Sequence, residues 1–140
     1  MIRKVKEQDL SKVMELIELH AEWEKSPYTE GVDDKENLRK QIFEKGDLNC
    51  LVIEVDGEVV GYCTYIKQYS TWGAHYYNYM DCLFLHENHR NQGWGKKLID
   101  YIKEDGLPMQ WQTPPHNTMG VGFYNHVGAK GKEKIRFYYE

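Results

Sequence analysis

Residues 90–97 read Arg-Asn-Gln-Gly-Trp-Gly-Lys-Lys and lie between a predicted strand and a predicted helix. Glycines at a helix start let the backbone approach a ligand and leave the first N–H groups pointing outward. Lys96 and Lys97 fall in the first helical turn, where the helix dipole disfavours cations by up to about 1 kcal/mol. Arg90 stands just ahead, and nothing acidic caps the helix. A bound phosphate would reverse this penalty, so the stretch predicts an anion site; the alternative is a glycine turn with exposed lysines.

Two other glycine-rich phosphate loops fit this stretch poorly. A Walker A loop needs more residues between its glycines and a Ser or Thr after its lysine, but Lys97 and Leu98 follow Lys96. A dinucleotide-binding loop needs a third Gly or Ala three residues after Gly95, where Leu98 stands. The stretch therefore belongs to neither loop type.

The hydrophobic pattern around the glycine stretch predicts a mixture of strands and helices. Leu10, Val13 and Ile17 recur at helical spacing, and Asp56-Gly57 between two β-rich runs is typical of a hairpin turn. The predicted strands cover residues 2–5, 50–55, 59–69, 75–85, 109–113 and 135–139, and the predicted helices cover residues 8–24, 34–44, 94–106 and 117–126. This order predicts an α+β arrangement around one mixed sheet, in a single domain over residues 1–140.

Composition excludes several classes of protein. The apolar runs are too short to cross a bilayer, and the N-terminus lacks the apolar core of a signal peptide, which makes the cytoplasm the default location. A net charge of −4 argues against a nucleic-acid partner. Cys50, Cys63 and Cys82 are odd in number, lie in apolar segments and form no CxxC pair. They are expected to be reduced core residues, without a disulfide framework or a structural zinc site.

Negative charge is concentrated between residues 20 and 36. This segment contains two lysines and the acidic residues Glu22, Glu24, Glu30, Asp33, Asp34 and Glu36. Such a patch would attract a cationic ligand. An ordinary solvated surface of two helices and a loop explains the same pattern, and both interpretations stay open.

Two motifs in order resemble those of the GNAT acetyltransferases. Arg90-x-x-Gly93-x-Gly95 after a strand resembles the family's pyrophosphate-binding loop, and residues 117–129 resemble a later motif in which Asn opens a helix and Phe-Tyr precedes Gly-Ala. Residues 69–85 are most similar to the spermidine/spermine (diamine) N-acetyltransferase branch. The chain departs from that branch by being short between Ile102 and Met109 and by carrying Pro114-Pro115-His116 before Asn117.

The resemblance implies a GNAT fold, with a central mixed, mostly antiparallel sheet flanked by helices. It implies an acetyl-CoA-dependent N-acetyltransferase acting on a small cationic amine, such as a polyamine or a lysine-like amine, and a homodimer. The implied cofactor contacts are the backbone of Leu83, Phe84 and Leu85 for the pantetheine arm, residues Arg90, Asn91, Gln92, Gly93, Trp94, Gly95 and Lys96 for the pyrophosphate, and Asn117 and Tyr124 beside the pantetheine and thioester.

Transfer to an amine requires removal of a proton, because an amine with a pKa near 10 is protonated at neutral pH. Asp81 is the candidate base, as the one charged side chain between His75 and Leu85. Among Met, Cys, Leu and Phe, a poorly solvated carboxylate holds a proton more readily, and the matching position in the diamine branch is also acidic. The alternatives are a carboxylate satisfied at the sheet surface or one that only binds the substrate cation.

Tyr124 is the candidate acid for the leaving thiolate. It lies seven residues after Asn117, about two helical turns, so the two are expected to share a face. Proton transfer from an ordinary phenol to a thiolate is uphill by roughly 2 kcal/mol. Full transfer and a hydrogen bond to the developing charge both stay open, as does a half-buried helix tyrosine with no role.

Other chemistries have weaker support. Cys82 beside Asp81 suggests a thiol nucleophile, but a carboxylate is a poor activator of a thiol. The histidines lack metal-ligand spacing, so no metal is expected. Two rival functions remain: a protein or peptide N-acetyltransferase on the same scaffold, and a non-catalytic acyl-CoA-binding sensor.

Overall fold

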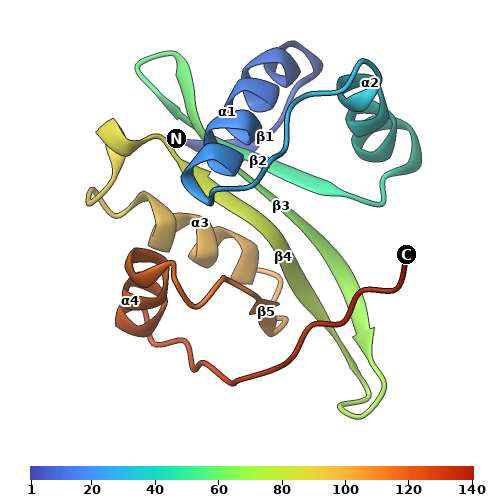
Figure 1. The fold of residues 1–140 in the computed structure, drawn as a ribbon, viewed down its shortest axis with the longest axis vertical. Helices are drawn as coiled ribbons and strands as arrows, with labels where there is room; N and C mark the ends of the chain where they lie inside the picture. The colour runs from blue at the N-terminus through green and yellow to red at the C-terminus, as the bar shows by residue number, and fades with distance from the viewer.

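The computed structural model describes residues 1–140 and contains one five-stranded sheet with the strand order β1-β2-β3-β4-β5 (Figure 1). The strands are β1 (Ile2–Lys4), β2 (Asn49–Val55), β3 (Glu58–Ser70), β4 (His75–Leu85) and β5 (Met109–Trp111). The first four strands are antiparallel in sequence order, and β5 runs parallel to β4. The prediction of an α+β fold with a mixed, mostly antiparallel sheet is confirmed.

The long β3–β4 hairpin extends well beyond the rest of the sheet (Figure 1). The β2–β3 hairpin turns at Asp56 and Gly57, which have φ angles of 52° and 81°. Positive φ at both central residues is the geometry that matches the twist of flanking strands, and Asp-Gly adopts it readily. The dipeptide therefore sets the register of these two strands, as the sequence predicts.

Most of the helices match the predicted segments. They are α1 (Leu10–Trp23), α2 (Asp34–Arg39), α3 (Trp94–Lys103) and α4 (Thr118–His126), with short 3₁₀ helices η1 (Glu7–Asp9) and η3 (Glu87–His89). The helix predicted over residues 34–44 is divided, because α2 passes into a π-helical segment, η2 (Lys40–Lys45), before ending at Gly46 with φ of 68°. None of the helices combines the length and apolarity needed to span a bilayer.

Two hydrophobic clusters lie on opposite faces of the sheet. Leu10, Val13 and Leu16 of α1 pack on one face, against side chains that include Tyr62 and Phe84. On the other face, α3 packs against β2, β3 and β4, in a cluster made of Leu51, Ile53, Val60, Cys63, Met80, Leu98 and Ile102. Alternating side chains of β2 supply the two clusters, with Cys50 and Val52 on one face and Leu51 and Ile53 on the other, as the period of a β-strand requires. The sheet is thus covered on both faces.

The strand predicted over residues 135–139 is wrong. Residues 129–140 form no strand or helix, and Ile135, Phe137 and Tyr139 are at least 81% exposed. Aromatic and β-branched residues favour a strand only where a neighbouring strand supplies hydrogen bonds and a face to pack on. Within this chain the segment pairs with no strand, so its composition alone does not order it as one.

Candidate active site

The parallel strands β4 and β5 pair over only three residues and then diverge. The paired residues of β4 are Asn78, Tyr79 and Met80, opposite Met109 to Trp111. Beyond Met80, residues 81–85 have β3 as their only strand neighbour. Unpaired backbone groups at such an edge can bind an extended ligand in the manner of an added strand. Leu83 lies on this open edge, while the carbonyl of Phe84 faces Gly61 of β3 and the carbonyl of Leu85 already accepts a hydrogen bond of 2.8 Å from Arg90 Nε.

Asp81 lies at a β-bulge where the strands begin to diverge. The β3–β4 register shifts there, because Thr64 pairs with Cys82 and Tyr65 pairs with Met80. A bulge redirects side chains and is common beside active sites. The apolar surroundings expected for Asp81 are not found, since its side chain is exposed and its nearest polar contact is Cys82 Sγ at 3.8 Å from Oδ2.

Cys82 is not arranged as a nucleophile. Burial is the main cause that raises the pKa of its thiol to about 11, and the Asp81 carboxylate adds to it. The thiol therefore stays protonated at neutral pH, whereas a nucleophilic role would need the thiolate. Cys50 and Cys63 are buried and free, as expected of reduced core residues.

The predicted anion site is a helix start without a cap. Asn91 and Gly93 adopt left-handed backbone conformations, with φ of 62° and 83°. Gly93 is the N-cap residue of α3, no side chain caps the helix, and no acidic residue lies in its first turn. The N–H groups of that turn are therefore free to bind an anion. Gly95 has a separate role, because a β-carbon there would lie 2.7 Å from Cζ of Phe123 in α4.

The three cations near this helix start have partners that the sequence analysis did not identify. Lys96 Nζ lies 2.7 Å from Asp100 Oδ2, one helical turn further on, and Lys97 Nζ lies 4.7 Å from the centre of the Trp94 ring. The Lys96 pair is exposed, so it contributes well under about 1 kcal/mol and is easily exchanged for a phosphate.

The Arg90 guanidinium points toward α1. It lies 4.2 Å from the centre of the Trp23 ring and 5.3 Å from that of Phe84, besides donating to the Leu85 carbonyl. In this arrangement Arg90 joins the end of β4 to the end of α1. Its side chain does not point freely outward beside the lysines.

Asn117 is the N-cap residue of α4, in agreement with the predicted helix start. The Asn117 Oδ1 accepts a hydrogen bond of 3.1 Å from the Gly120 N–H, and its Nδ2 donates to Thr113 Oγ1 at 2.9 Å. The side chain is therefore an N-cap that fixes the helix start. Asn117 also lines the pocket described below, but Tyr124 is not among the lining residues.

Tyr124 packs on the α3 side of the sheet, against Trp111, with ring centres 5.1 Å apart. Burial raises its pKa to about 12, and the Glu24 carboxylate adds to this effect. Proton transfer to a thiolate of ordinary pKa would then be uphill by roughly 5 kcal/mol. A hydrogen bond from the neutral phenol is the chemistry that this environment favours.

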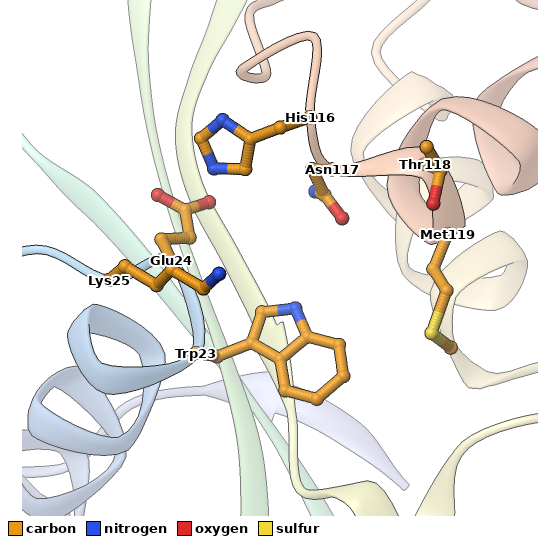
Figure 2. Close-up of a pocket in the computed structure, with 7 residues that line it drawn as sticks. All are labelled: Trp23, Glu24, Lys25, His116, Asn117, Thr118 and Met119. Atoms are coloured by element: carbon orange, nitrogen blue, oxygen red, sulfur yellow. The ribbon is translucent and has the colours of Figure 1, made fainter.

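A pocket of about 500 Å³ lies between the end of α1 and the start of α4 (Figure 2). This volume is within the range of small-molecule sites. Its lining residues are Trp23, Glu24, Lys25, His116, Asn117, Thr118 and Met119. Trp23 and His116 were not identified from the sequence, and Glu24 appeared only as one of six acidic residues.

Two members of the wider acidic patch have partners within the fold. Asp34 accepts hydrogen bonds from the Tyr28 hydroxyl and the Gly31 N–H, and Glu36 pairs with Arg39. Glu24, in contrast, is half-buried and lies in the pocket. No group of three or more His, Cys, Asp or Glu side chains is arranged to hold a metal ion.

Comparison with known proteins agrees with this geometry. The model of the acetyltransferase (GNAT) family matches residues 13–129. This chain belongs to the GNAT acetyltransferase family. The thialysine N-epsilon-acetyltransferase of Bos taurus is 35% identical, over 93% of this chain and 84% of the relative. The same enzyme of Mus musculus is 31% identical, over 92% and 83%.

Solved structures of acetyltransferases have the same fold. A possible acetyltransferase from Clostridium difficile 630 superposes with a TM-score of 0.83 at 16% identity, covering 100% of this chain and 96% of that one. An aminoglycoside N-acetyltransferase in complex with CoA gives 0.81 at 19% identity, covering 100% and 93%. The chain is thus a GNAT N-acetyltransferase, a member of a family that uses acetyl-CoA.

Proposed function

We propose that this N-acetyltransferase transfers the acetyl group of acetyl-CoA to the primary amine of a small cationic acceptor bound between α1 and α4. The observation that carries the proposal is the pocket itself, which places the Glu24 carboxylate and the Trp23 ring at the end of α1. A carboxylate attracts an ammonium group by charge, and an indole face adds a cation–π contact. Lys25 also lines the pocket and Arg90 lies against the Trp23 ring, so the Glu24 carboxylate is the lining group that would attract the acceptor ammonium against these two cations.

The cofactor is proposed to lie along the open edge of β4 and the start of α3. The backbone of Leu83 would hold the pantetheine arm, and residues 90–96 would hold the pyrophosphate. The uncapped first turn of α3 supports this placement, because no side chain accepts from its first N–H groups. Arg90 would act chiefly through its backbone, since its guanidinium is held by Trp23 and Leu85. Acetyl-CoA supplies the activated acetyl group, and no protein nucleophile is needed.

The catalytic roles are proposed for Asp81 and Tyr124. Asp81 would accept the proton of the acceptor ammonium, directly or through water, so that the free amine can attack the acetyl carbonyl. As the carbon–sulfur bond breaks, Tyr124 would donate a hydrogen bond to the sulfur. The raised pKa of Tyr124 supports a hydrogen-bonding role over full proton transfer.

The acceptor is proposed to be a lysine-like amine. This rests on the similarity to thialysine N-epsilon-acetyltransferases over more than nine-tenths of the chain. A polyamine carries the same cationic primary amine and is the second member of the proposed class. Asn117 would border the acceptor and the thioester end of the cofactor, because it lines the pocket and starts α4.

A thiol-release assay with acetyl-CoA tests the proposal. We expect lysine, thialysine and polyamines to release coenzyme A faster than neutral or anionic amines, aminoglycosides or lysine-bearing peptides. Fastest release with a peptide would instead establish a protein or peptide acetyltransferase. Tight acetyl-CoA binding without thiol release for any amine would indicate a non-catalytic sensor.

We also infer that residues 1–140 act as one domain and that two copies form a homodimer. The exposed side chains of Ile135, Phe137 and Tyr139 support the dimer, because this apolar segment has no partner within one chain. The three free thiols are compatible with a cytoplasmic protein.

A further inference from the structure

His20 is a largely buried imidazole on the apolar side of α1, next to the proposed acceptor pocket. Its side chain is 14% exposed, and its ring stacks on Phe84 with centres 5.2 Å apart. Both ring nitrogens have partners: Nδ1 lies 2.8 Å from the Tyr62 hydroxyl, and Nε2 lies 3.2 Å from Glu24 Oε1. The imidazole therefore bridges a buried strand residue and the carboxylate that lines the pocket.

The chemistry of the partners fixes the tautomer of a neutral His20. A carboxylate accepts hydrogen bonds, so Nε2 must carry the hydrogen that faces Glu24. Nδ1 then has a free lone pair and accepts the hydrogen of the Tyr62 hydroxyl. This gives one directed chain, in which Tyr62 donates to His20 and His20 donates to Glu24. The Tyr62 side chain is almost completely buried, so it anchors the chain in the core.

The burial of His20 favours the neutral ring at physiological pH. Burial is the main cause that lowers its pKa below the ordinary value of 6.5, and the Arg90 guanidinium lowers it further. The Glu24 and Asp81 carboxylates oppose this effect. Cys82 on β4 and Tyr62 on β3 stay neutral, because burial raises the pKa of each. The neutral ring leaves Glu24 with its full negative charge.

We propose that His20 is a positioning residue, which holds the Glu24 carboxylate in the acceptor pocket and leaves its charge available to a cationic substrate while the imidazole is neutral. This inference rests on the proposed function, since it assigns a partner to the acceptor-binding carboxylate. Protonation of the ring in acid would create an ion pair with Glu24. That pair would compete with the acceptor ammonium, so the KM for the acceptor would rise as the pH falls toward the lowered pKa of His20.

Two substitutions separate positioning from titration. His20→Gln can place its amide N–H near the position of Nε2, so it keeps a donor for Glu24 but cannot gain a proton. His20→Leu fills the space but removes the donor. We expect His20→Leu to raise the acceptor KM about tenfold at pH 8 while lowering kcat and the acetyl-CoA KM much less, because a charge-assisted hydrogen bond is lost. His20→Gln should recover much of this loss and should abolish the rise in acceptor KM in acid.

His126→Gln, at an exposed position near the end of α4, is the matched control and should behave as the wild type. An unchanged acceptor KM in His20→Leu, or an acid rise in KM that persists in His20→Gln, would overturn the inference. If the wild type releases no thiol with any amine, the proposed function and this inference fail together.

A second measurement does not depend on activity. Nitrogen-15 NMR of the wild-type imidazole groups reports tautomer and charge directly. At pH 7 we expect the His20 signal, identified by its absence from His20→Gln, to be that of a neutral ring with its hydrogen on Nε2. A cationic ring at pH 7, or a hydrogen on Nδ1, would overturn the proposed direction of the hydrogen-bond chain.

Discussion

The Phe123 ring of α4 lies against Gly95 of α3 so closely that a β-carbon at position 95 would come within 2.7 Å of Cζ. The two helices are adjacent in Figure 1, and one carries the proposed pyrophosphate site while the other carries Tyr124. We expect Gly95→Ala to lower the free energy of unfolding by about 1–2 kcal/mol and to weaken coenzyme A binding, because the Phe123 ring must move away from the added methyl group. Urea denaturation and calorimetry measure both effects.

Gly122→Ala is the matched control for that substitution. It lies in α4, and a β-carbon there would meet no atom within 4 Å. Alanine is the better helix former, so this variant should gain about 0.5–1 kcal/mol. Equal effects of the two substitutions would show that the Gly95–Phe123 contact does not govern the packing of these helices.

Asp81→Asn should lower kcat by about 100-fold or more at neutral pH, because the proposed proton acceptor is lost. Asp56→Asn is the control, since Asn-Gly forms the same hairpin turn as Asp-Gly and this turn lies outside the site. Steady-state rates with a saturating amine are compared across pH. Normal turnover of Asp81→Asn at every pH would remove Asp81 from the mechanism.

Tyr124→Phe should lower kcat about tenfold with little change in the acceptor KM, because a hydrogen bond to the developing thiolate is lost. Tyr101→Phe, a half-buried tyrosine on α3, is the matched control. Since the pKa of Tyr124 is raised to about 12, we expect no loss of activity from its ionisation below pH 10. Unchanged turnover in Tyr124→Phe would exclude the proposed role.

Stability in acid should depend on Asp9. Arg3 donates to Asp9 Oδ2 at 2.7 Å and to Glu54 Oε1 at 2.9 Å, and its hydrogen bond is the main cause that lowers the Asp9 pKa. A carboxyl whose pKa is lower in the folded state stabilises the fold above its unfolded pKa, and this stability is lost as the pH falls through the folded value.

We therefore expect Asp9→Asn to cost about 3 kcal/mol at pH 7 and progressively less below about pH 4. Thermal unfolding at a series of pH values measures the difference. A cost that stays constant from pH 7 to pH 2 would contradict the assigned role of the pair. Lys12→Met, which removes only an exposed ion pair with Glu15, should change stability little at either pH.

Removal of residues 132–140 should convert the proposed homodimer into a monomer without unfolding the domain, because these residues form no element of the sheet. Light scattering gives the mass, and circular dichroism checks the fold. A truncated chain that remains dimeric would place the interface elsewhere, and a monomeric full-length chain would exclude the dimer.

The sequence predicts those features that depend only on residues close to one another along the chain. Gly93, the Asp56-Gly57 turn and the Asn117 helix start were all recognisable, because each is a local backbone requirement. It did not reveal that the Arg90 side chain lies on Trp23, since these residues are distant in sequence and meet only in the fold. The strand predicted at residues 135–139 was wrong for a related reason, because strand formation depends on a partner.

Two features could have been found from local spacing. Lys96 and Asp100 are four residues apart on one helix, which is the spacing of an ion pair. His20 is also four residues before Glu24, and it lies seven residues after Val13 on the apolar face of α1. A polar residue on an apolar face requires buried partners, and the spacing indicates Glu24 as one of them, while the contact with Tyr62 exists only in the fold.

Titration calorimetry of the purified chain with coenzyme A and with pantetheine tests the anion site at the start of α3 most directly. We expect coenzyme A to bind and pantetheine, which lacks the diphosphate and the adenosine nucleotide attached to it, to bind at least about 100-fold more weakly, because several charge-assisted hydrogen bonds are lost. Equal binding of the two compounds, or no measurable binding of coenzyme A or its acetyl ester, would contradict the assignment of this site.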